Sequence, residues 1–242
     1  MGERRLAVLW GDQHIELGEI AAEPLPPRAA IALSRGRFPK DYHAVDPNED
    51  AVLAASGPAG WLLAVVDGHN GLDAARAALD AVAGHAEALL ADPALQPEAA
   101  IEGLFDRARA AVAERLRQAE PSRRGSRTAL TIALLTDGSL HAASLGDTVA
   151  ARIGPRWVAE VGGGRPFLGP STPTPPVGSV LLGRQDAALV ASDGLIDYLG
   201  DSCHERLLAA GRASDPLQAV QRLVLAAFAG GAGDNVAVGL FT

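Results

Sequence analysis

Two long apolar runs of the sequence end abruptly in an Asp-Gly pair. Residues 61–66 lead into Asp67, and residues 187–192 lead into Asp193. Runs this apolar are typical of buried strands. Most Asp-Gly pairs are simple turns, and this alternative holds for either pair taken alone. Two buried strands that end in carboxylates at one end of a core would place negative charges side by side, which is costly unless a cation lies there.

Two other segments offer carboxylates beside an apolar run. The stretch PNEDA places Glu49 and Asp50 before one such run, and Asp234 precedes the run VAVGLF. All three are hard oxygen donors, and neither a cysteine nor a pair of histidines lies nearby in the sequence. Such a group suits Mn²⁺ or Mg²⁺ better than Zn²⁺.

The spacing of apolar residues predicts the elements that would position these carboxylates. Helical spacing extends over residues 72–90, 98–118, 205–210 and 216–229. Apolar runs of strand length cover residues 29–33, 61–66, 179–182, 187–191 and 235–241, and residues 128–153 read as strand, hairpin turn at Asp137-Gly138, strand, tight turn and strand. Strands grouped together, with helices in pairs, favour two packed sheets flanked by helices over alternating βαβ units.

The bulk properties limit the class of protein. A chain of 242 residues with 48% hydrophobic content can bury the core of one domain, which we expect over residues 28–242, with residues 1–27 as an extension packed on it. The net charge of −8 argues against general affinity for nucleic acid. A single cysteine and the lack of a long apolar segment favour a cytoplasmic protein without a membrane span.

Six short motifs occur along the chain. They are NEDA (48–51), VVDGHNG (65–71), GSRTA (125–129), SLGDTVA (144–150), VASDGLIDYL (190–199) and GDNVAV (233–238). Through them, and through their order, the chain resembles the metal-dependent Ser/Thr protein phosphatases of the PP2C type, in a compact bacterial form. The resemblance implies an α+β fold: a four-layer α/β/β/α sandwich of two antiparallel sheets flanked by helix pairs, with a two-metal centre at one end.

The same resemblance implies roles for individual residues. Asp67 would bridge two ions of Mn²⁺ or Mg²⁺. Glu49 and the Gly68 carbonyl would complete the site of one ion. Asp193 and Asp234 would complete the site of the other. A third, weaker ion would use Asp147 and Asp197 together with Asp193, with a tight β-turn as the alternative for Asp147. A metal-activated water would then hydrolyse phosphoserine or phosphothreonine in proteins.

His69 has two alternative roles in that scheme. It either donates a proton to the leaving oxygen or orients a carboxylate or a bound water. The single thiol, Cys203, has no basic phosphate-binding loop around it, so the sequence does not predict a cysteine-based mechanism.

The chain departs from the family pattern in three places. Asn70 replaces a usual glycine, although asparagine tolerates left-handed backbone. The stretch 154–178 is short, so the subdomain that often shapes substrate access is reduced. Many members carry an arginine four residues before the motif glutamate, where this chain has Val45; Arg37, and secondly Arg35, are the candidates to bind the substrate phosphate instead. Solvated loop charges are the alternative for both.

Two functions remain open from the sequence. The first is a signalling hydrolase that acts on phosphorylated proteins, opposite a cognate Ser/Thr kinase. The second is a catalytically silent PP2C-like module that binds a phosphoprotein or a regulator. The retained carboxylates favour the first, and the missing arginine favours the second.

Overall fold

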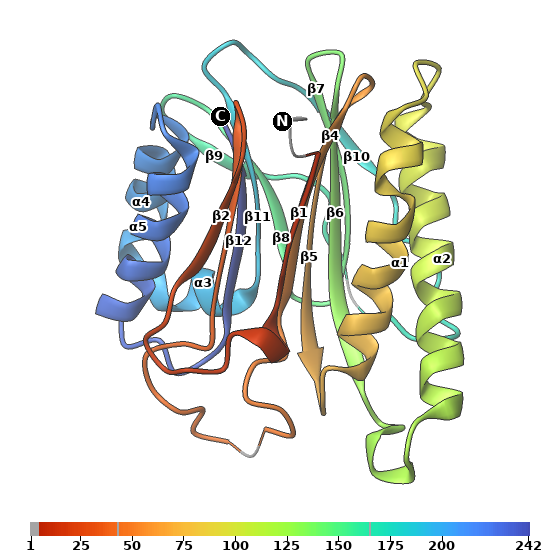
Figure 1. Ribbon diagram of the computed structural model, residues 1–242. Helices are drawn as coiled ribbons and strands as arrows, with labels where there is room; N and C mark the ends of the chain where they lie inside the picture. The colour runs from red at the N-terminus through yellow and green to blue at the C-terminus, as the bar shows by residue number, and fades with distance from the viewer. Residues whose placement is uncertain (1–4, 43, 165) are drawn as a thin grey trace.

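The computed structural model describes residues 5–42, 44–164 and 166–242. Within these residues the chain forms two six-stranded sheets that pack face to face, with helices on both outer faces (Figure 1). All strand pairs are antiparallel. The α+β class and the four-layer arrangement read from the sequence are therefore confirmed.

The first sheet has the order β1-β4-β5-β6-β7-β10. Its strands are β1 (Leu6–Trp10), β4 (Ala51–Gly57), β5 (Gly60–His69), β6 (Arg127–Thr136), β7 (Ser139–Leu145) and β10 (Gly178–Leu181). Two long helices, α1 (Asp73–Leu90) and α2 (Pro97–Gln118), cover its outer face (Figure 1).

The second sheet has the order β2-β3-β12-β11-β8-β9. Its strands are β2 (Ala21–Leu25), β3 (Ala29–Ser34), β12 (Val236–Phe241), β11 (Ala187–Ala191), β8 (Val149–Ile153) and β9 (Val158–Glu160). Its outer face is covered by α3 (Asp193–Leu199), α4 (Cys203–Gly211) and α5 (Pro216–Ala229). The Asp215 carboxylate caps α5 by accepting bonds from the N–H groups of Leu217 and Gln218.

The continuous apolar run of β5 follows from its place in the middle of these layers. Leu63 and Val65 pack between the two sheets, while Leu62, Ala64 and Val66 pack under the helices. Both faces of the strand are buried, so the alternation of apolar and polar residues that a half-exposed strand shows is absent. The same burial fixes the position of Asp67, because the strand that carries it cannot slip by one residue without turning its side chains over.

Four elements of the fold were not predicted from the sequence. The predicted bounds of α1, α2 and α5 lie within one residue of those observed, whereas β1, β2, β9 and α3 were not predicted. Residues 6–10 and 21–25 supply an edge strand to each sheet, and the division of the domain at residue 27 stays a prediction. Between residues 154 and 178 the described residues contain β9 and no helix.

The predicted tight turn at Asp147 is a crossing between sheets. The hairpin at Asp137-Gly138 is confirmed, since both residues have positive φ between β6 and β7. In contrast, β7 and β8 belong to different sheets, so residues 146–148 carry the chain from one to the other. The buried Thr131 hydroxyl holds this crossing in place through bonds to Ser144 (2.7 Å) and Thr148 (2.8 Å).

No helix in the described part of the chain combines the length and the apolar character that crossing a membrane requires.

The loop before β4 is tied to the first helix layer by one arginine. Arg123 donates to both carboxylate oxygens of Asp46, at 2.8 and 2.9 Å, and also to Asp73 at the start of α1. The N–H of Leu72 donates to Asp46 as well. The Arg123 bonds, and then the Leu72 bond, hold the pKa of Asp46 below its usual range, although partial burial opposes this. Residues 46–50 are thereby fixed relative to the end of β5.

Replacing this carboxylate should loosen the loop. Asp46→Asn removes a charge-assisted, partly exposed contact and should lower the free energy of unfolding by about 1–2 kcal/mol at pH 7. A lowered pKa stabilises the fold above the usual carboxyl pKa of about 4 and loses that contribution as the pH falls through the lowered value. Urea unfolding of both proteins at pH 7 and pH 3 should show the difference shrink at acid pH; an equal difference at both would contradict the ion pair.

Candidate metal centre

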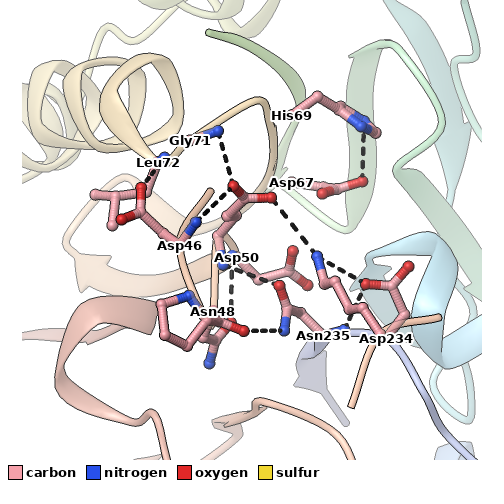
Figure 2. A network of polar contacts seen from close by, with 12 residues as sticks. Asp46, Asn48, Asp50, Asp67, His69, Gly71, Leu72, Asp234 and Asn235 are labelled. Carbon is pink, nitrogen blue, oxygen red and sulfur yellow. Dashed lines mark hydrogen bonds and ion pairs between the residues drawn. The ribbon is translucent and has the colours of Figure 1, made fainter. Parts of the chain in front are cut away.

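Carboxylates from five separate segments meet at one end of the sandwich. They come from the end of β5, the end of β11, the start of β12, the crossing between β7 and β8, and the loop before β4. The residues are Asp67, Asp193, Asp234, Asp147 and Asp50. Figure 2 shows three of them, Asp50, Asp67 and Asp234, around a common space. The expectation that the buried strands end side by side in carboxylates is met.

Asp67, His69 and Asp147 form the tightest group in this centre. One ligand atom from each lies within 4.8 Å of the others. The Nε2 atom of His69 lies 3.3 Å from an Asp67 oxygen and 3.9 Å from an Asp147 oxygen. The Phe167 ring packs edge-on against the imidazole, with 4.5 Å between ring centroids. The short stretch 154–178 thus supplies the wall that holds His69 over the carboxylates.

The carboxylates repel one another strongly in this arrangement. Burial first, and then the charges of Asp67, Asp147 and Asp234, raise the pKa of Asp193 to about 7. Burial and the charge of Asp67 likewise raise the pKa of Asp50 well above its usual range. For His69, burial alone would lower the pKa, but hydrogen bonds and charges from Asp147 and Asp67 raise it to about 10. The centre therefore favours any positive charge placed in it.

Asp50 is a residue of this centre that the sequence offered as an oxygen donor but that the family resemblance did not place among the metal ligands. It is 2% exposed, and its Oδ2 atom has no hydrogen-bond partner among the described residues. A buried carboxylate oxygen without a partner is costly, and a cation is the partner that suits it. The signal was present in the sequence, because Asp50 shares the NEDA motif with Glu49.

The Glu49 side chain, the predicted ligand, lies in a different setting. Its Oε1 atom accepts bonds from the N–H groups of Gly71 (2.7 Å) and Asp46 (3.2 Å). Its Oε2 atom lies 3.6 Å from the Lys40 ammonium. In this geometry the Oε1 atom of Glu49 accepts hydrogen bonds from the loop backbone. Ligation of a metal by Glu49 stays a prediction.

The turn after Asp67 explains the small residues of its motif. A Cβ atom on Gly68 would come within 2.8 Å of the Glu49 carbonyl oxygen, so a side chain there would push the NEDA loop away. Asn70 adopts a φ of 60°, which confirms the expected left-handed conformation, and Gly71 follows with a φ of 102°. These values turn the chain from β5 into α1 and bring the Gly71 N–H to Glu49.

Asn235 fastens three segments of the centre together. Its amide oxygen accepts a bond from the Glu49 N–H at 2.9 Å, and its amide nitrogen donates to the carbonyls of Arg35 and Pro47, each at 3.1 Å. It is 1% exposed. The neutral amide therefore sets the distance between the start of β12 and the NEDA loop without adding charge.

Within the described residues, the two arginines predicted to bind phosphate form no ion pair with the carboxylates of the centre. The Arg35 guanidinium donates to the Ile15 carbonyl at 2.8 Å, and the Arg37 guanidinium lies 5.6 Å from the centroid of the Phe38 ring. Val45 is 42% exposed on the same loop. Phosphate binding by Arg35 or Arg37 stays a prediction.

Lys40 is the basic residue of this loop that enters the centre. Its ammonium lies 2.9 Å from an Asp234 oxygen, and the side chain is 7% exposed. Burial alone would lower the pKa of Lys40, but the charges of Asp234 and Asp50 raise it above its ordinary value. The sequence predictions for this loop named Arg37 and Arg35, and gave Lys40 no role.

Two further residues that the sequence raised are Asp197, a predicted ligand of the third ion, and Cys203, the single thiol. Asp197 is exposed on α3, one turn after Asp193, and within the described ranges no ion pair or hydrogen bond links its side chain to the other carboxylates. Cys203 begins α4 and is half-buried, and burial raises the pKa of its thiol. A thiol of raised pKa is a poor nucleophile, as the sequence analysis expected.

The donor set fits hard divalent cations. The centre offers carboxylate oxygens and an imidazole, and the buried Asp50 Oδ2 atom has no hydrogen-bond partner among the described residues. Mn²⁺ and Mg²⁺ prefer oxygen ligands of this kind.

Comparison with known proteins agrees with this geometry. A sequence model described as protein phosphatase 2C matches residues 39–159, half of the chain. The chain belongs to the protein phosphatase 2C family. No curated protein sequence matches it closely enough to count as a relative.

Solved structures of bacterial phosphatases share the protein phosphatase 2C fold seen here. One is the serine/threonine phosphatase PstP/Ppp of Mycobacterium tuberculosis, 22% identical, with a TM-score of 0.71 over 88% of this chain and 97% of that one. The catalytic domain of PstP in complex with 2 manganese ions is 23% identical, with a TM-score of 0.71 over 92% and 98%. Serine/threonine phosphatase Stp1 from Staphylococcus aureus is 20% identical, with a TM-score of 0.73 over 95% and 97%. The resemblance stated from the motifs is confirmed.

Removing one charge from the metal-free centre should stabilise the fold. In EDTA at pH 8, Asp193→Asn should unfold at higher urea than the unchanged protein, by about 1 kcal/mol or more, because the ionised carboxylate is partly buried among like charges. The matched control is Asp186→Asn, whose carboxylate is paired with Arg152 at 2.6 Å and 5% exposed, and which should lose stability. Loss of stability in both variants would show that the carboxylates of the centre do not repel one another.

Proposed function

We propose that this chain is a protein-serine/threonine phosphatase whose activity depends on Mn²⁺ or Mg²⁺. The observation that carries the proposal is the meeting of five carboxylates at one end of the sandwich, those of Asp50, Asp67, Asp147, Asp193 and Asp234. Their burial and their charges raise the pKa values of Asp50 and Asp193. The Oδ2 atom of Asp50 has no hydrogen-bond partner among the described residues. Family membership supports the same reaction, and PstP, a structural neighbour, was solved with 2 manganese ions.

The aspartates at the strand ends would hold the ions. Asp67, Asp193 and Asp234 lie where the layers fix them. Asp50 adds a buried oxygen that has no hydrogen-bond partner within residues 5–42, 44–164 and 166–242. The Gly68 carbonyl, Glu49 and a third site at Asp147 with Asp197 complete the predicted set. Bound Mn²⁺ or Mg²⁺ supplies a nucleophile from water at neutral pH and offsets the negative charge of the phosphoryl group.

The protein's own groups then position the substrate and move protons. Asp67 and Asp147 hold the His69 ring from one side, and Phe167 holds it from another. This places Nε2 beside the carboxylates, where it can donate a proton to the leaving oxygen of a phosphoserine or phosphothreonine.

The silent binding module remains the alternative function. The absence of an arginine at Val45, and the engagement of Arg35 and Arg37 elsewhere, favour it. The complete set of aspartates favours hydrolysis, since a module that only binds phosphate has no need to keep five acidic side chains, which repel an anion.

Phosphorylated proteins are the proposed substrates, a cognate Ser/Thr kinase is the proposed counterpart, and the cytoplasm is the proposed location.

Hydrolysis should require the metal and the aspartates. Purified protein should hydrolyse an aryl phosphate and a phosphothreonine peptide with Mn²⁺ and not with EDTA. Asp67→Asn and Asp50→Asn should each lower kcat by about 100-fold or more, because the loss of an anionic ligand misplaces the nucleophile.

The control is Asp186→Asn, which changes a carboxylate that pairs with Arg152 outside the centre. This variant should keep the turnover of the unchanged protein at a temperature where it is folded. Turnover that EDTA does not change would contradict the metal mechanism. Binding of the phosphopeptide without turnover, in the presence of Mn²⁺, would favour the silent module.

A further inference from the structure

The basic residue in the carboxylate centre is the only lysine in the sequence. The chain contains 21 lysines and arginines, and all except Lys40 are arginines. The Lys40 side chain is almost fully buried, at 7% exposed. Its ammonium lies 2.9 Å from Asp234 and 3.6 Å from Glu49.

The fold delivers Lys40 to this position through backbone contacts. The N–H groups of Arg37 and Phe38 both donate to the Ala232 carbonyl, at 2.8 and 3.0 Å. Gly36, with a φ of 101°, lies so close to the Asp234 carbonyl oxygen that a Cβ atom would come within 2.4 Å of it. Residues 36–40 therefore run directly alongside residues 232–234, and the lysine side chain points into the centre from that side.

Among the described residues, the Lys40 ammonium is the one cation that forms an ion pair with Asp234, whereas the His69 imidazole lies beside Asp67 and Asp147. The closest partner of the ammonium, Asp234, also accepts from the Tyr42 hydroxyl at 3.2 Å, but that bond brings no positive charge. Asp50 lies near enough to interact with Lys40 through its charge. No arginine among the described residues forms an ion pair with Asp50, Asp193 or Asp234.

Lysine suits this place better than arginine does. An ammonium is a compact point charge on a flexible stem, whereas a guanidinium is a broad planar fork that binds two oxygens at once. A point charge can occupy the space of a small cation between carboxylates and can leave it by rotation about the stem.

We propose that the Lys40 ammonium is a built-in counter-ion of the carboxylate centre, which a divalent cation displaces when it binds. The inference rests on the proposed metal-dependent function. Lys40 acts on the metal through Asp234 and its neighbours, so it is a residue that tunes metal affinity and is not a metal ligand.

The displaced side chain has a place to go. A surface pocket adjoins the centre and is lined by Lys40 itself together with Arg35, Tyr42, Val45 and Asp46. Rotation of the lysine stem into this pocket would keep the ammonium in contact with solvent and with the Asp46 side of the loop.

Removing the charge should strengthen metal binding. Coulomb's law in the dielectric of bulk water gives about a tenfold change in dissociation constant for a unit charge about 5 Å from a dication. Isothermal titration of Mn²⁺ should therefore show binding to Lys40→Met that is at least about tenfold tighter than to the unchanged protein. Equal or weaker binding by Lys40→Met would overturn the proposal.

The same variant should be less stable without metal. In EDTA, Lys40→Met should melt at a lower temperature than the unchanged protein because the carboxylates lose their counter-ion, and saturating Mn²⁺ should remove the difference. The matched control is Arg152→Met, which breaks the buried pair with Asp186 outside the centre. This control should lose stability both with and without Mn²⁺ and keep the dissociation constant of the unchanged protein within about twofold.

Chemical modification tests displacement in the unchanged protein. Because the chain has one lysine, an amine-acetylating reagent modifies only Lys40 and the N-terminal amine, and the second serves as the internal reference. Mass spectrometry should show Lys40 acetylated several-fold faster with Mn²⁺ than with EDTA. A rate that Mn²⁺ leaves unchanged or lowers would overturn displacement, even if Lys40→Met failed to fold.

The outcomes also separate this inference from the proposed function. If the unchanged protein binds Mn²⁺ and hydrolyses phosphopeptide while Lys40→Met binds Mn²⁺ equally, the counter-ion role is wrong and the phosphatase function stands. If the unchanged protein binds no Mn²⁺, both are wrong.

Discussion

The mutual repulsion of buried carboxylates is the interaction on which the rest of this structure depends. Asp67 lies close enough to Asp50 and Asp193 for its charge to raise the pKa values of both, and a flexible scaffold would let these carboxylates separate. The two sheets prevent this, because β5 is packed on both faces and cannot shift its register. The free energy of burying apolar strands and helices thus holds in place a charge arrangement that is unfavourable without a cation.

The positions of the strongest ligand candidates followed from simple features of the sequence. Asp67 and Asp193 each end a run that is apolar on both faces, and this pattern depends only on burial. The edge strands β1 and β2 were missed because short, half-exposed segments with proline and glycine nearby carry little periodic signal. Helix α3 was missed because its seven residues are too few for helical spacing to be distinguished from a turn after Asp-Gly.

The parts of the centre that sequence could not give depend on tertiary contacts. Glu49 and Asp50 are neighbours in the motif, and only the bonds from the Gly71 and Asp46 N–H groups to Glu49 tell the two carboxylates apart. Lys40 reaches Asp234 across 194 positions of the chain because residues 36–38 lie against Ala232 and Asp234. Contacts of this kind between loops leave no periodicity, so charge balance in the site could not be predicted.

The most direct test of the central claim is to locate the cations. Crystals grown with Mn²⁺ and measured at the manganese absorption edge should give anomalous peaks in contact with the oxygens of Asp67, Asp193 and Asp234. Such peaks would show that the carboxylates converge to hold divalent metal. An anomalous map without peaks at these three side chains, from crystals in millimolar Mn²⁺, would contradict the account.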